Sequence, residues 1–324
     1  MSKLKASILT GFLGAGKTTL LNRVLSERAD ERIAVIVNEY GEVGIDGKLI
    51  VETRDEVVEL NNGCICCTVR EDLIVAIKSI LNSGRPIDRV VIETSGLADP
   101  APVIQSFILD DEISRRLELD AIVTVVDARY IERQLSQDEA VEQITFADIL
   151  LLNKTDLESE DRLADIERQL RRLNSLAEII KTRLCAVSLD KILDRGAFDL
   201  KNILTLDPAI FAEHVHEHDQ RVRCVAIREQ TPVNSAAFNS WLNRLVQDRG
   251  PDLFRMKGVI NFANEARRFV FHGVHMTMEG RPGRPWTTSD RPVSELVFIG
   301  RDLDEGLLRE GFASCLDERR AMAS

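Results

Sequence analysis

Three of the six cysteines in this 324-residue chain fall within four positions, in the segment NNGCICC at residues 61–67. The first residues, MSKLKASILT, lack the long apolar segment and the small-residue cleavage site of a secretory signal, so we expect a cytoplasmic protein with reduced cysteines. Cys66 and Cys67 are sequence neighbours, and a disulfide between them would be strained. A disulfide is therefore a weaker interpretation of this segment than thiolate chemistry.

The thiols of Cys64, Cys66 and Cys67 favour a transition-metal site. Several thiolates presented together are soft ligands that suit Zn²⁺, and Co²⁺ accepts a similar tetrahedral site. Redox chemistry and incidental burial of small side chains are the two alternatives.

The segment GFLGAGKT at residues 11–18 matches the phosphate-binding pattern G-x-x-x-x-G-K-[ST] without deviation. It follows the apolar run ASILT and precedes the amphipathic run TLLNRVL, which predicts a loop between a strand and a helix. Lys17 should reach the terminal phosphates, and the Thr18 hydroxyl should hold Mg²⁺. The alternative is a glycine-rich turn without a ligand. The predicted phosphate-binding residues are Gly11, Gly14, Ala15, Gly16, Lys17, Thr18 and Thr19.

The segment NKTD follows the buried run ADILLL, where a parallel sheet presents its ligand crevice. An N-K-x-D element reads guanine in P-loop GTPases, its aspartate accepting hydrogen bonds from the ring N–H and the exocyclic amine. We therefore assign base recognition to Asn153, Lys154 and Asp156, and we expect GTP rather than ATP.

Two further loops follow strands at the same predicted edge. In ETSGLADP, residues 93–100, Glu93 should act on the Mg²⁺ shell, and the Gly96 amide should meet the γ-phosphate; a polar turn is the alternative. The acidic, glycine-punctuated segment NEYGEVGID, residues 38–46, resembles a switch that closes on a triphosphate, with a plain mobile loop as the alternative.

These motifs require a sheet that places them at one edge. Apolar runs such as IAVIVNE, RVVIE and AIVTVVD alternate with amphipathic stretches, including helices through Leu20 and Leu25 and from about Glu71. This alternation predicts an α/β fold, a P-loop NTPase parallel sheet with helices on both faces. The predicted domain spans residues 1–207, and a linker that contains His214, His216 and His218 spans residues 208–220.

Residues 221–324 predict a smaller α+β domain. We expect strands near RVRCVAI, FRMKGVINF, RRFVFHGVHM and ELVFIGR, a helix over residues 235–247 and a last helix over residues 303–315. The isolated Cys185, Cys224 and Cys315 are interpreted as small buried hydrophobic residues.

The composition excludes some classes of partner. With 44% hydrophobic residues the chain can bury a sizeable core, and its net charge of −11 argues against binding a nucleic-acid backbone or an anionic membrane. No run approaches the roughly 18 apolar residues of a transmembrane helix. Any phosphate must therefore be held locally.

Together the motifs resemble the CobW family of GTPases, P-loop proteins associated with metal delivery. The resemblance covers almost the whole chain and rests on GFLGAGKTTLL, VNEYGEVGID, ELNNGCICC, ETSGLADP, NKTD, RMKGVI, HGVH and VFIGR, in that order. It implies a CobW-type C-terminal domain and a C-x-C-C metal motif at Cys64, Cys66 and Cys67. It also implies that Glu42, in the switch-like segment, supplies a carboxylate ligand, with Glu39 as a weaker alternative and a solvated loop charge as the plain one.

The resemblance implies a slow GTPase that loads Zn²⁺, or less favourably Co²⁺, into a client metalloprotein, with GTP hydrolysis changing the ligand geometry. No arginine finger or water-positioning glutamine is assigned, so a partner should accelerate turnover. The family alternatives are cobalt delivery for cobalamin biosynthesis and activation of a nitrile-hydratase-type enzyme. From other classes, a non-catalytic metal store or sensor and an ATP-dependent small-molecule kinase also stay open, as does assembly into a homo-oligomer.

Overall fold

The computed structural model describes residues 3–40, 56–62, 67–197, 222–287 and 290–317, with the backbone alone at residues 38–40, 56–62 and 67–70. The chain divides into two compact units. One comprises Met1–Arg171 and Ala177–Asp199, and the other comprises Arg172–Leu176 and Leu200–Ser324. The predicted linker and both of its boundaries fall within residues 198–221, outside the described residues, and stay predictions.

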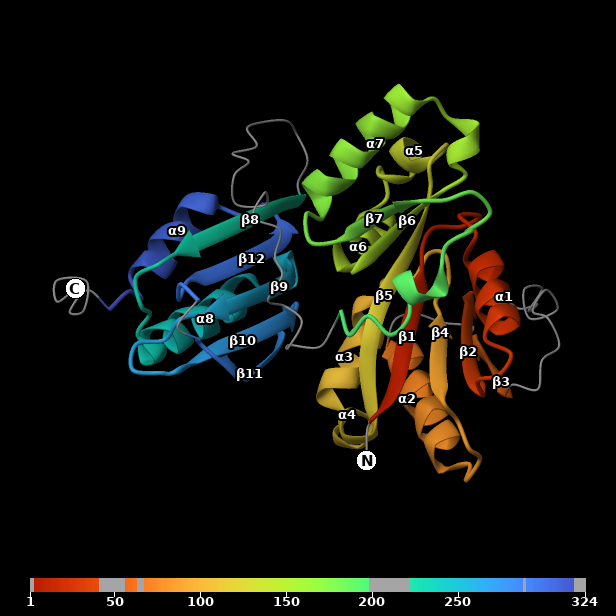
Figure 1. The fold of residues 1–324 in the computed structure, drawn as a ribbon, viewed down its shortest axis with the longest axis horizontal. Helices are drawn as coiled ribbons and strands as arrows, with labels where there is room; N and C mark the ends of the chain where they lie inside the picture. Colours follow the sequence, from red (N-terminus) through yellow and green to blue (C-terminus); the bar gives the residue numbers. More distant parts are fainter. Residues whose placement is uncertain (1–2, 41–55, 63–66, 198–221, 288–289, 318–324) are drawn as a thin grey trace. The chain divides into compact units, whose positions relative to one another are not determined.

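The first unit is built on a seven-stranded sheet in the order β3-β2-β4-β1-β5-β6-β7 (Figure 1). Each neighbouring pair of strands is parallel. Because the strands run in one direction, their carboxyl ends share one edge of the sheet. The strands are β1 (Leu4–Thr10), β2 (Ile33–Tyr40), β3 (Glu56–Asn62), β4 (Arg89–Glu93), β5 (Leu117–Asp127), β6 (Ile149–Asn153) and β7 (Glu178–Lys181).

Parallel pairing needs long crossover connections, and helices lie in those that the structure describes. They are α1 (Lys17–Glu27), α2 (Cys67–Asn82), α3 (Ala101–Leu109), α4 (Asp111–Arg116), α5 (Ile131–Gln134), α6 (Asp138–Phe146) and α7 (Glu160–Leu173), with short 3₁₀ turns η2 (Thr155–Leu157) and η3 (Leu189–Lys191).

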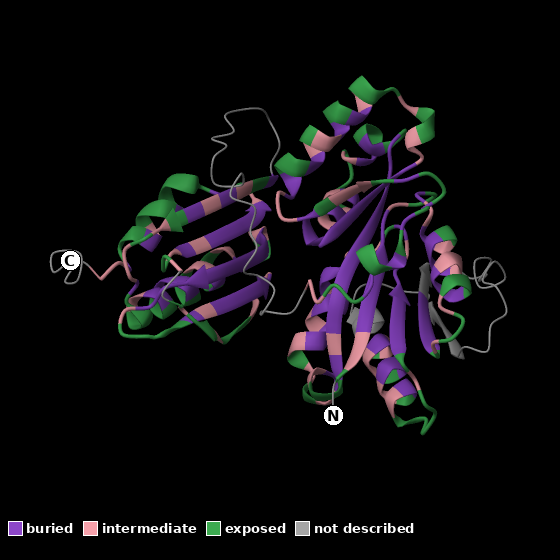
Figure 2. Cartoon of the chain, viewed as in Figure 1, coloured by how far each residue is buried: buried purple, intermediate pink, exposed green. Residues whose placement is uncertain are grey.

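Both faces of this sheet are covered, and the central strands are buried along their length (Figure 2). Leu9 and Val35 pack in one core cluster with Leu21 of α1. Their neighbours Ile8 and Ile36 point to the opposite face, because side chains alternate along a strand, and they too are fully buried. Burial on both faces explains why the strands read as continuous apolar runs.

The second unit holds a five-stranded sheet in the order β11-β10-β9-β12-β8. Its neighbouring strands are antiparallel. Its elements are β8 (Val222–Glu229), α8 (Ser235–Arg249), η5 (Gly250–Asp252), β9 (Leu253–Ile260), β10 (Arg267–Val274), β11 (Thr277–Pro285), β12 (Ser294–Arg301) and α9 (Glu305–Ala313).

An aromatic cluster forms the core of the second unit, between α8, α9 and one face of the sheet. Phe238 of α8 lies 5.8 Å, centroid to centroid, from both Trp241 and Phe271. Gly311 of α9 allows α9 to approach α8 closely, since a Cβ there would lie 2.2 Å from Nε1 of Trp241.

The two sheets confirm the predicted fold, a P-loop-type parallel sheet with a separate smaller domain.

Some elements differ from the sequence prediction. Residues 267–276 were expected to form one strand, but β10 ends at Val274, and His275 turns the chain with a φ of 50°. Strand β11 follows and was not predicted, because its glycines, prolines and charged residues do not form a strand pattern. The structure accommodates this sequence because β11 is an edge strand. Strands β3 and β7, the two edges of the parallel sheet, were also missed. Strand β7 is four residues long and only partly buried.

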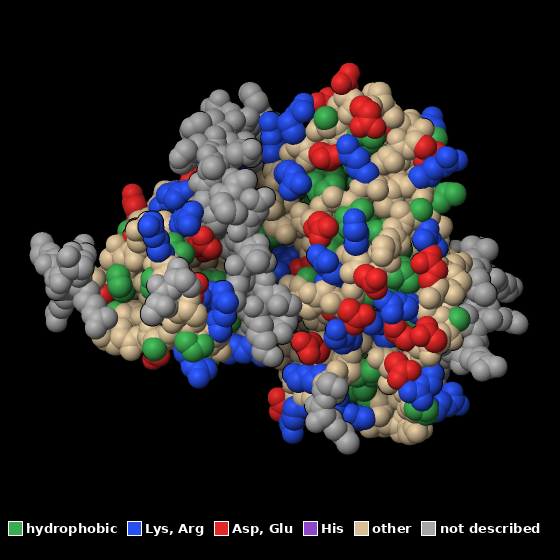
Figure 3. Space-filling view, viewed as in Figure 1, with side chains coloured by type: hydrophobic (Ala, Val, Ile, Leu, Met, Phe, Trp, Pro, Cys, Tyr) green, Lys and Arg blue, Asp and Glu red, His purple; other side chains and the backbone are tan. Residues whose placement is uncertain are grey.

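Charged side chains of both signs lie interspersed on the face shown in Figure 3. Pairs at the surface of the first unit include Lys181 with Glu167 at 2.7 Å and Arg195 with Glu178 at 2.8 Å. Within the described residues, no helix is long and apolar enough to span a bilayer.

Candidate nucleotide site

The phosphate-binding pattern forms the loop between β1 and α1, at the carboxyl edge of the sheet. Gly11 and Gly16 have φ angles of 135° and 118°, a region that side chains disfavour. A Cβ on Gly11 would lie 2.2 Å from the carbonyl oxygen of Val125, and one on Gly16 would lie 2.7 Å from Nδ2 of Asn153. Glycine is therefore required at both positions, because the backbone has positive φ angles there and because a side chain would collide with β5 or β6.

Lys17 is the first residue of α1 and is 9% exposed. Its Nζ donates hydrogen bonds to the carbonyl oxygens of Gly11 at 2.8 Å and Phe12 at 3.3 Å. The ammonium group thus lies over the loop that the sequence predicts to hold phosphate. Gly14, Ala15 and Thr19 lie in or beside the same loop, where Ala15 N donates to Phe12 O at 3.2 Å.

Thr18 and Glu93 meet at this edge. The hydroxyl of Thr18 donates to the carboxylate of Glu93 at 3.2 Å, and Glu93 is 5% exposed. They come together because β1 and β4 are neighbours, with Leu9 paired to Glu93. A hydroxyl and a carboxylate are hard oxygen donors of the kind Mg²⁺ prefers, so Thr18, with Glu93 acting through water, fits the predicted Mg²⁺ role.

Gly96 lies against the phosphate-binding loop. A Cβ at this position would fall 2.8 Å from the backbone nitrogen of Leu13. The segment after β4 is anchored by a hydrogen bond from Thr94 N to Leu9 O at 2.9 Å. The predicted γ-phosphate contact of Gly96 is therefore consistent with its position beside the loop.

Asn153, at the end of β6, is 2% exposed and braces two loops. Its Nδ2 donates to the carbonyl oxygen of Ala15 at 2.9 Å. Its Oδ1 accepts from the backbone nitrogen of Cys185 at 2.9 Å and from the hydroxyl of Thr182 at 3.2 Å. Asn153 thereby joins the phosphate-binding loop to the segment after β7.

Lys154 joins the same loop to β5. Its Nζ donates to the carbonyl oxygen of Gly14 at 2.8 Å and forms a 2.6 Å ion pair with Asp127. Its backbone is left-handed, with a φ of 61°, and η2 begins at the next residue. Asp127 is 1% exposed and also accepts from the backbone nitrogen of Arg129 at 3.0 Å. Lys154 is therefore paired with a carboxylate that is itself fixed in place.

Asp156 lies in η2 and is exposed, with Nε of Arg183 3.5 Å from its carboxylate. An exposed carboxylate in the turn after β6 can accept hydrogen bonds from a base. The assigned roles of Asn153, Lys154 and Asp156 stay predictions.

Several predicted metal ligands lie outside the described residues: Glu42, Cys64, Cys66, and the linker residues His214, His216 and His218. Cys67 is the first residue of α2, and its side chain is not described. No group of three or more His, Cys, Asp or Glu that could hold a metal is found in the described part of the chain. The assignment of the thiol motif therefore stays a prediction.

The remaining cysteines are free. Cys185 and Cys315 are buried, as expected, whereas Cys224 is only partly buried and lies 3.1 Å from the hydroxyl of Ser175. Burial raises the pKa of the Cys185 thiol to about 11, so this thiol is largely protonated at neutral pH.

Two residues that hold this site together were not predicted from the sequence: Asp127, which pairs with Lys154, and Gln143, which donates to the carbonyl oxygen of Gly96. Asp127 ends the apolar run AIVTVVD, and a carboxylate at the end of a buried strand was a signal that could have identified it. Gln143 lies inside helix α6, where nothing in the surrounding sequence distinguishes it.

The family comparison agrees with this geometry. The model of the "CobW/HypB/UreG, nucleotide-binding domain" matches residues 5–181, more than half of the chain. The chain belongs to this family. A second model, "Cobalamin synthesis protein cobW C-terminal domain", matches residues 222–316, so the predicted membership in the CobW family is confirmed for both units.

Two curated CobW-family relatives align with nearly the whole length of this chain. The zinc chaperone YjiA of Escherichia coli is 33% identical over 97% of this chain and 99% of its own. The zinc-regulated GTPase metalloprotein activator 1 of Schizosaccharomyces pombe is 32% identical over 94% of this chain and 84% of its own. A crystal structure of Zn(II)-bound YjiA GTPase from E. coli superposes with a TM-score of 0.79 at 27% identity, covering 98% of this chain.

Proposed function

We propose that this CobW-family chain is a GTP-hydrolysing metallochaperone that binds Zn²⁺ at Cys64, Cys66 and Cys67 and transfers it to a client metalloprotein. The chain is a GTPase. The observation that carries the proposal is the convergence of Lys17, Glu93 and Lys154 at one sheet edge, in a chain whose full-length relatives are named zinc chaperones.

The sheet order supports a coupling between nucleotide and metal. The chain leaves β2 at Tyr40 and β3 at Asn62, and these two residues are register partners. Glu42 and Cys64 each follow two positions later in the sequence. On the other side of β2, Val37 pairs with Glu93 of the predicted Mg²⁺ site. The switch-like segment and the thiol motif therefore begin from adjacent strand ends, next to the strand that carries Glu93.

For hydrolysis, Lys17 would stabilise the charge that develops on the terminal phosphates. The Thr18 hydroxyl would hold Mg²⁺, with Glu93 acting on its water shell, and the ion when bound would supply positive charge that neutralises the phosphates. Asn153 and Lys154 would fix the loop around the substrate, and Asp156 would select guanine. Low intrinsic turnover with acceleration by a partner is expected, because no described side chain is assigned to activate the attacking water.

Zn²⁺ is the cargo of the proposed chaperone. With three thiolates, the fourth tetrahedral position remains for a carboxylate such as Glu42, and Co²⁺ is the less favoured alternative to Zn²⁺. If the nucleotide state moves Glu42, the ion is held in one state and released to the client in the other.

The test measures Zn²⁺ affinity by competition with a chromophoric chelator for the nucleotide-free, GDP-bound and GTP-analogue-bound protein. We expect the affinity to differ between the GDP and GTP-analogue forms, and Cys66→Ala to lose most of the affinity with the analogue present. Equal affinity in the three forms would remove the coupling. GTP turnover no faster than the buffer blank, even with a client present, would leave a metal store or sensor.

A parallel assay compares GTP with ATP. Asp156→Ala should abolish the preference for guanine, since the acceptor for the base N–H groups is lost. Equal or tighter binding of ATP by the unmodified protein would favour a small-molecule kinase instead.

A further inference from the structure

The buried side chain of Gln143 links helix α6 to the loop after β4. The Nε2 of Gln143 donates to the carbonyl oxygens of Gly96 and Ala98, both at 3.1 Å. The two acceptors use both hydrogens of the amide, so they also fix which end of the side chain faces the loop. Gln143 is 1% exposed.

The backbone of Gln143 is anchored as well. Its carbonyl oxygen accepts a 2.7 Å hydrogen bond from the hydroxyl of Thr124, a buried residue of β5. The side chain is therefore held from the sheet and acts on the loop as a rigid support. α6 leads through a short connection into β6, which ends at Asn153.

Packing alone does not account for a glutamine at this position. Its Oε1 is buried and has no hydrogen-bond partner among the described residues. A buried amide with one unpaired end is unfavourable relative to an apolar side chain of the same size. The contact with the two carbonyls is the feature that an apolar residue could not reproduce.

The carbonyl that Gln143 holds belongs to the residue whose amide is predicted to meet the γ-phosphate. Gly96 lies against the phosphate-binding loop, and its own N–H donates no hydrogen bond to another part of the described chain. The carbonyl oxygen and the N–H of Gly96 belong to two peptide planes that meet at its Cα. The hydrogen bond from Gln143 fixes the plane after Gly96 and so restricts rotation about ψ of Gly96, which limits how the plane that carries the N–H can turn against it. The nearby turn, with Ala98 N donating to Ser95 O at 3.1 Å, leaves the Gly96 amide available.

We propose that Gln143 is a positioning residue that orients the Gly96 amide toward the γ-phosphate of bound GTP. This inference rests on the proposed function, because it concerns the same nucleotide site. It assigns to Gln143 an effect on the triphosphate state that is absent from the diphosphate state, since GDP has no γ-phosphate for the Gly96 amide to contact.

The test compares Gln143→Met, which keeps length and volume but donates no hydrogen bond, with Gln143→Glu, which places a carboxylate against two carbonyl oxygens. The control is Gln134→Met, at a glutamine in α5 that is also buried, at 8% exposure. In single-turnover assays we expect Gln143→Met to lower GTP hydrolysis about tenfold and to leave GDP affinity within about twofold. Gln143→Glu should lower hydrolysis further, and Gln134→Met should change neither quantity.

Amide hydrogen exchange of the segment 94–99 provides a readout that does not depend on catalysis. A GTP analogue should protect this segment more than GDP does in the unmodified protein, and Gln143→Met should remove that difference. Unchanged exchange in Gln143→Met, or a loss of GDP affinity as large as the loss of analogue affinity, would overturn the inference. If the unmodified protein hydrolysed no GTP, the proposed function would fail separately, and the exchange of this segment with the analogue bound would still decide the role of Gln143.

Discussion

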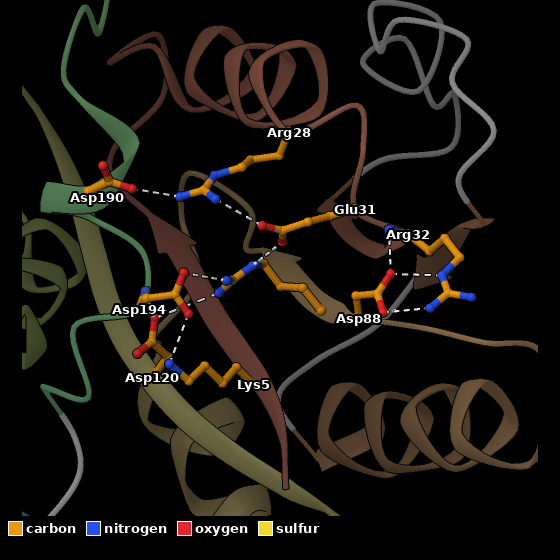
Figure 4. Close-up of polar contacts among 9 residues, drawn as sticks. Lys5, Arg28, Glu31, Arg32, Asp88, Asp120, Asp190 and Asp194 are labelled. Atoms are coloured by element: carbon orange, nitrogen blue, oxygen red, sulfur yellow. Dashed lines mark hydrogen bonds and ion pairs between the residues drawn. The ribbon is translucent and has the colours of Figure 1, made fainter. Parts of the chain in front are cut away.

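The two ends of the parallel sheet both gather charged side chains, but they use them differently. At the amino end, Arg89 of β4 donates to Glu31 at 3.1 Å and to Asp194 at 2.7 Å, and Lys5 of β1 donates to Asp194 at 2.8 Å. Arg28 extends the network from Glu31, at 3.1 Å, to Asp190, at 2.7 Å (Figure 4). Asp120 of β5 accepts from the backbone nitrogens of Asp194 and Gly196.

At the carboxyl end, both lysines contact backbone, and Lys154 also forms an ion pair with Asp127. Lys17 and Lys154 donate to carbonyl oxygens of the phosphate-binding loop, and Asn153 does the same through its amide. The amino-end network joins charged side chains to one another, adds the backbone contacts of Asp120, and ties residues 190–196 to the sheet. The carboxyl-end contacts fix the shape of loops. Paired charges stabilise a fold, whereas side chains that shape a loop prepare it for a ligand.

Protonation equilibria agree with this reading of the amino end. Burial alone would lower the pKa of Arg89, but hydrogen bonds to Asp194 and Glu31 outweigh it and raise the pKa. Burial likewise would raise the pKa of Asp194, and the hydrogen bonds from Lys5 and Arg89 lower it instead. Both groups therefore remain charged in the folded protein.

The largest effect should come from Lys17→Met at the carboxyl end. Removal of a charged donor to the terminal phosphates should lower GTP turnover by about 10²- to 10³-fold. Turnover is measured in a phosphate-release assay, with the melting temperature as the control for folding. Turnover within a few-fold of the unmodified protein would show that this loop does not carry the chemistry.

Arg89→Met removes the arginine that joins Glu31 and Asp194 in the amino-end network. The side chain of Arg89 is 4% exposed, and its loss leaves Asp194 and Glu31 without that partner. We expect the free energy of unfolding of the first unit to fall by about 3 kcal/mol, measured by denaturant titration. Nucleotide affinity of the folded protein should be unchanged.

Arg32→Met is the matched control for Arg89→Met. Arg32 forms a two-point ion pair with Asp88 at distances of 2.6 and 2.7 Å, but its side chain is 57% exposed (Figure 4). Its loss should destabilise the protein less, because water screens an exposed pair. Equal destabilisation by the two variants would mean that burial does not set the strength of this network.

The two ends of β5 allow a matched pair of carboxylate substitutions. Asp127→Asn removes the charge that holds Lys154 and should weaken GDP and GTP binding about tenfold. Asp120→Asn, at the other end of the strand, should lower stability and leave nucleotide affinity unchanged. Titration with a fluorescent guanine nucleotide measures both, and a loss of affinity in Asp120→Asn alone would reverse the assignment of the two ends.

The smallest effect is a pH dependence at the amino end. Hydrogen bonds from the side chain and backbone of Arg32 lower the pKa of Asp88 from 3.8 to about 2. Because the folded-state pKa is the lower one, the stabilisation is complete well above pH 3.8 and is lost as the pH falls through about 2. Asp88→Asn should therefore reduce, by a few degrees at most, the drop in melting temperature between pH 5 and pH 3. Identical drops in the two proteins would contradict this assignment.

The sequence predicted those parts of the fold and the site that depend on local patterns. Apolar runs predicted the central strands, because burial on both faces leaves no polar positions. GFLGAGKT, ETSGLADP and NKTD predicted which residues would meet, because each follows a strand in a parallel sheet. Strands β3, β7 and β11 were missed, and each lies at a sheet edge, where burial imposes no clear period.

By itself, then, the sequence determined the nucleotide-binding motifs, the family and the division into a parallel-sheet domain and a smaller α+β domain, since these are set by residue type and spacing along the chain. The antiparallel pairing of the second sheet was seen only in the structure. Only the tertiary structure showed that Asp127 holds Lys154, that Gln143 holds Gly96, and that Arg89 meets Asp194. In each case the partners are far apart in sequence. The smallest separation is 27 positions, between Asp127 and Lys154. Their contact depends on strand order and helix placement, which no local pattern specifies.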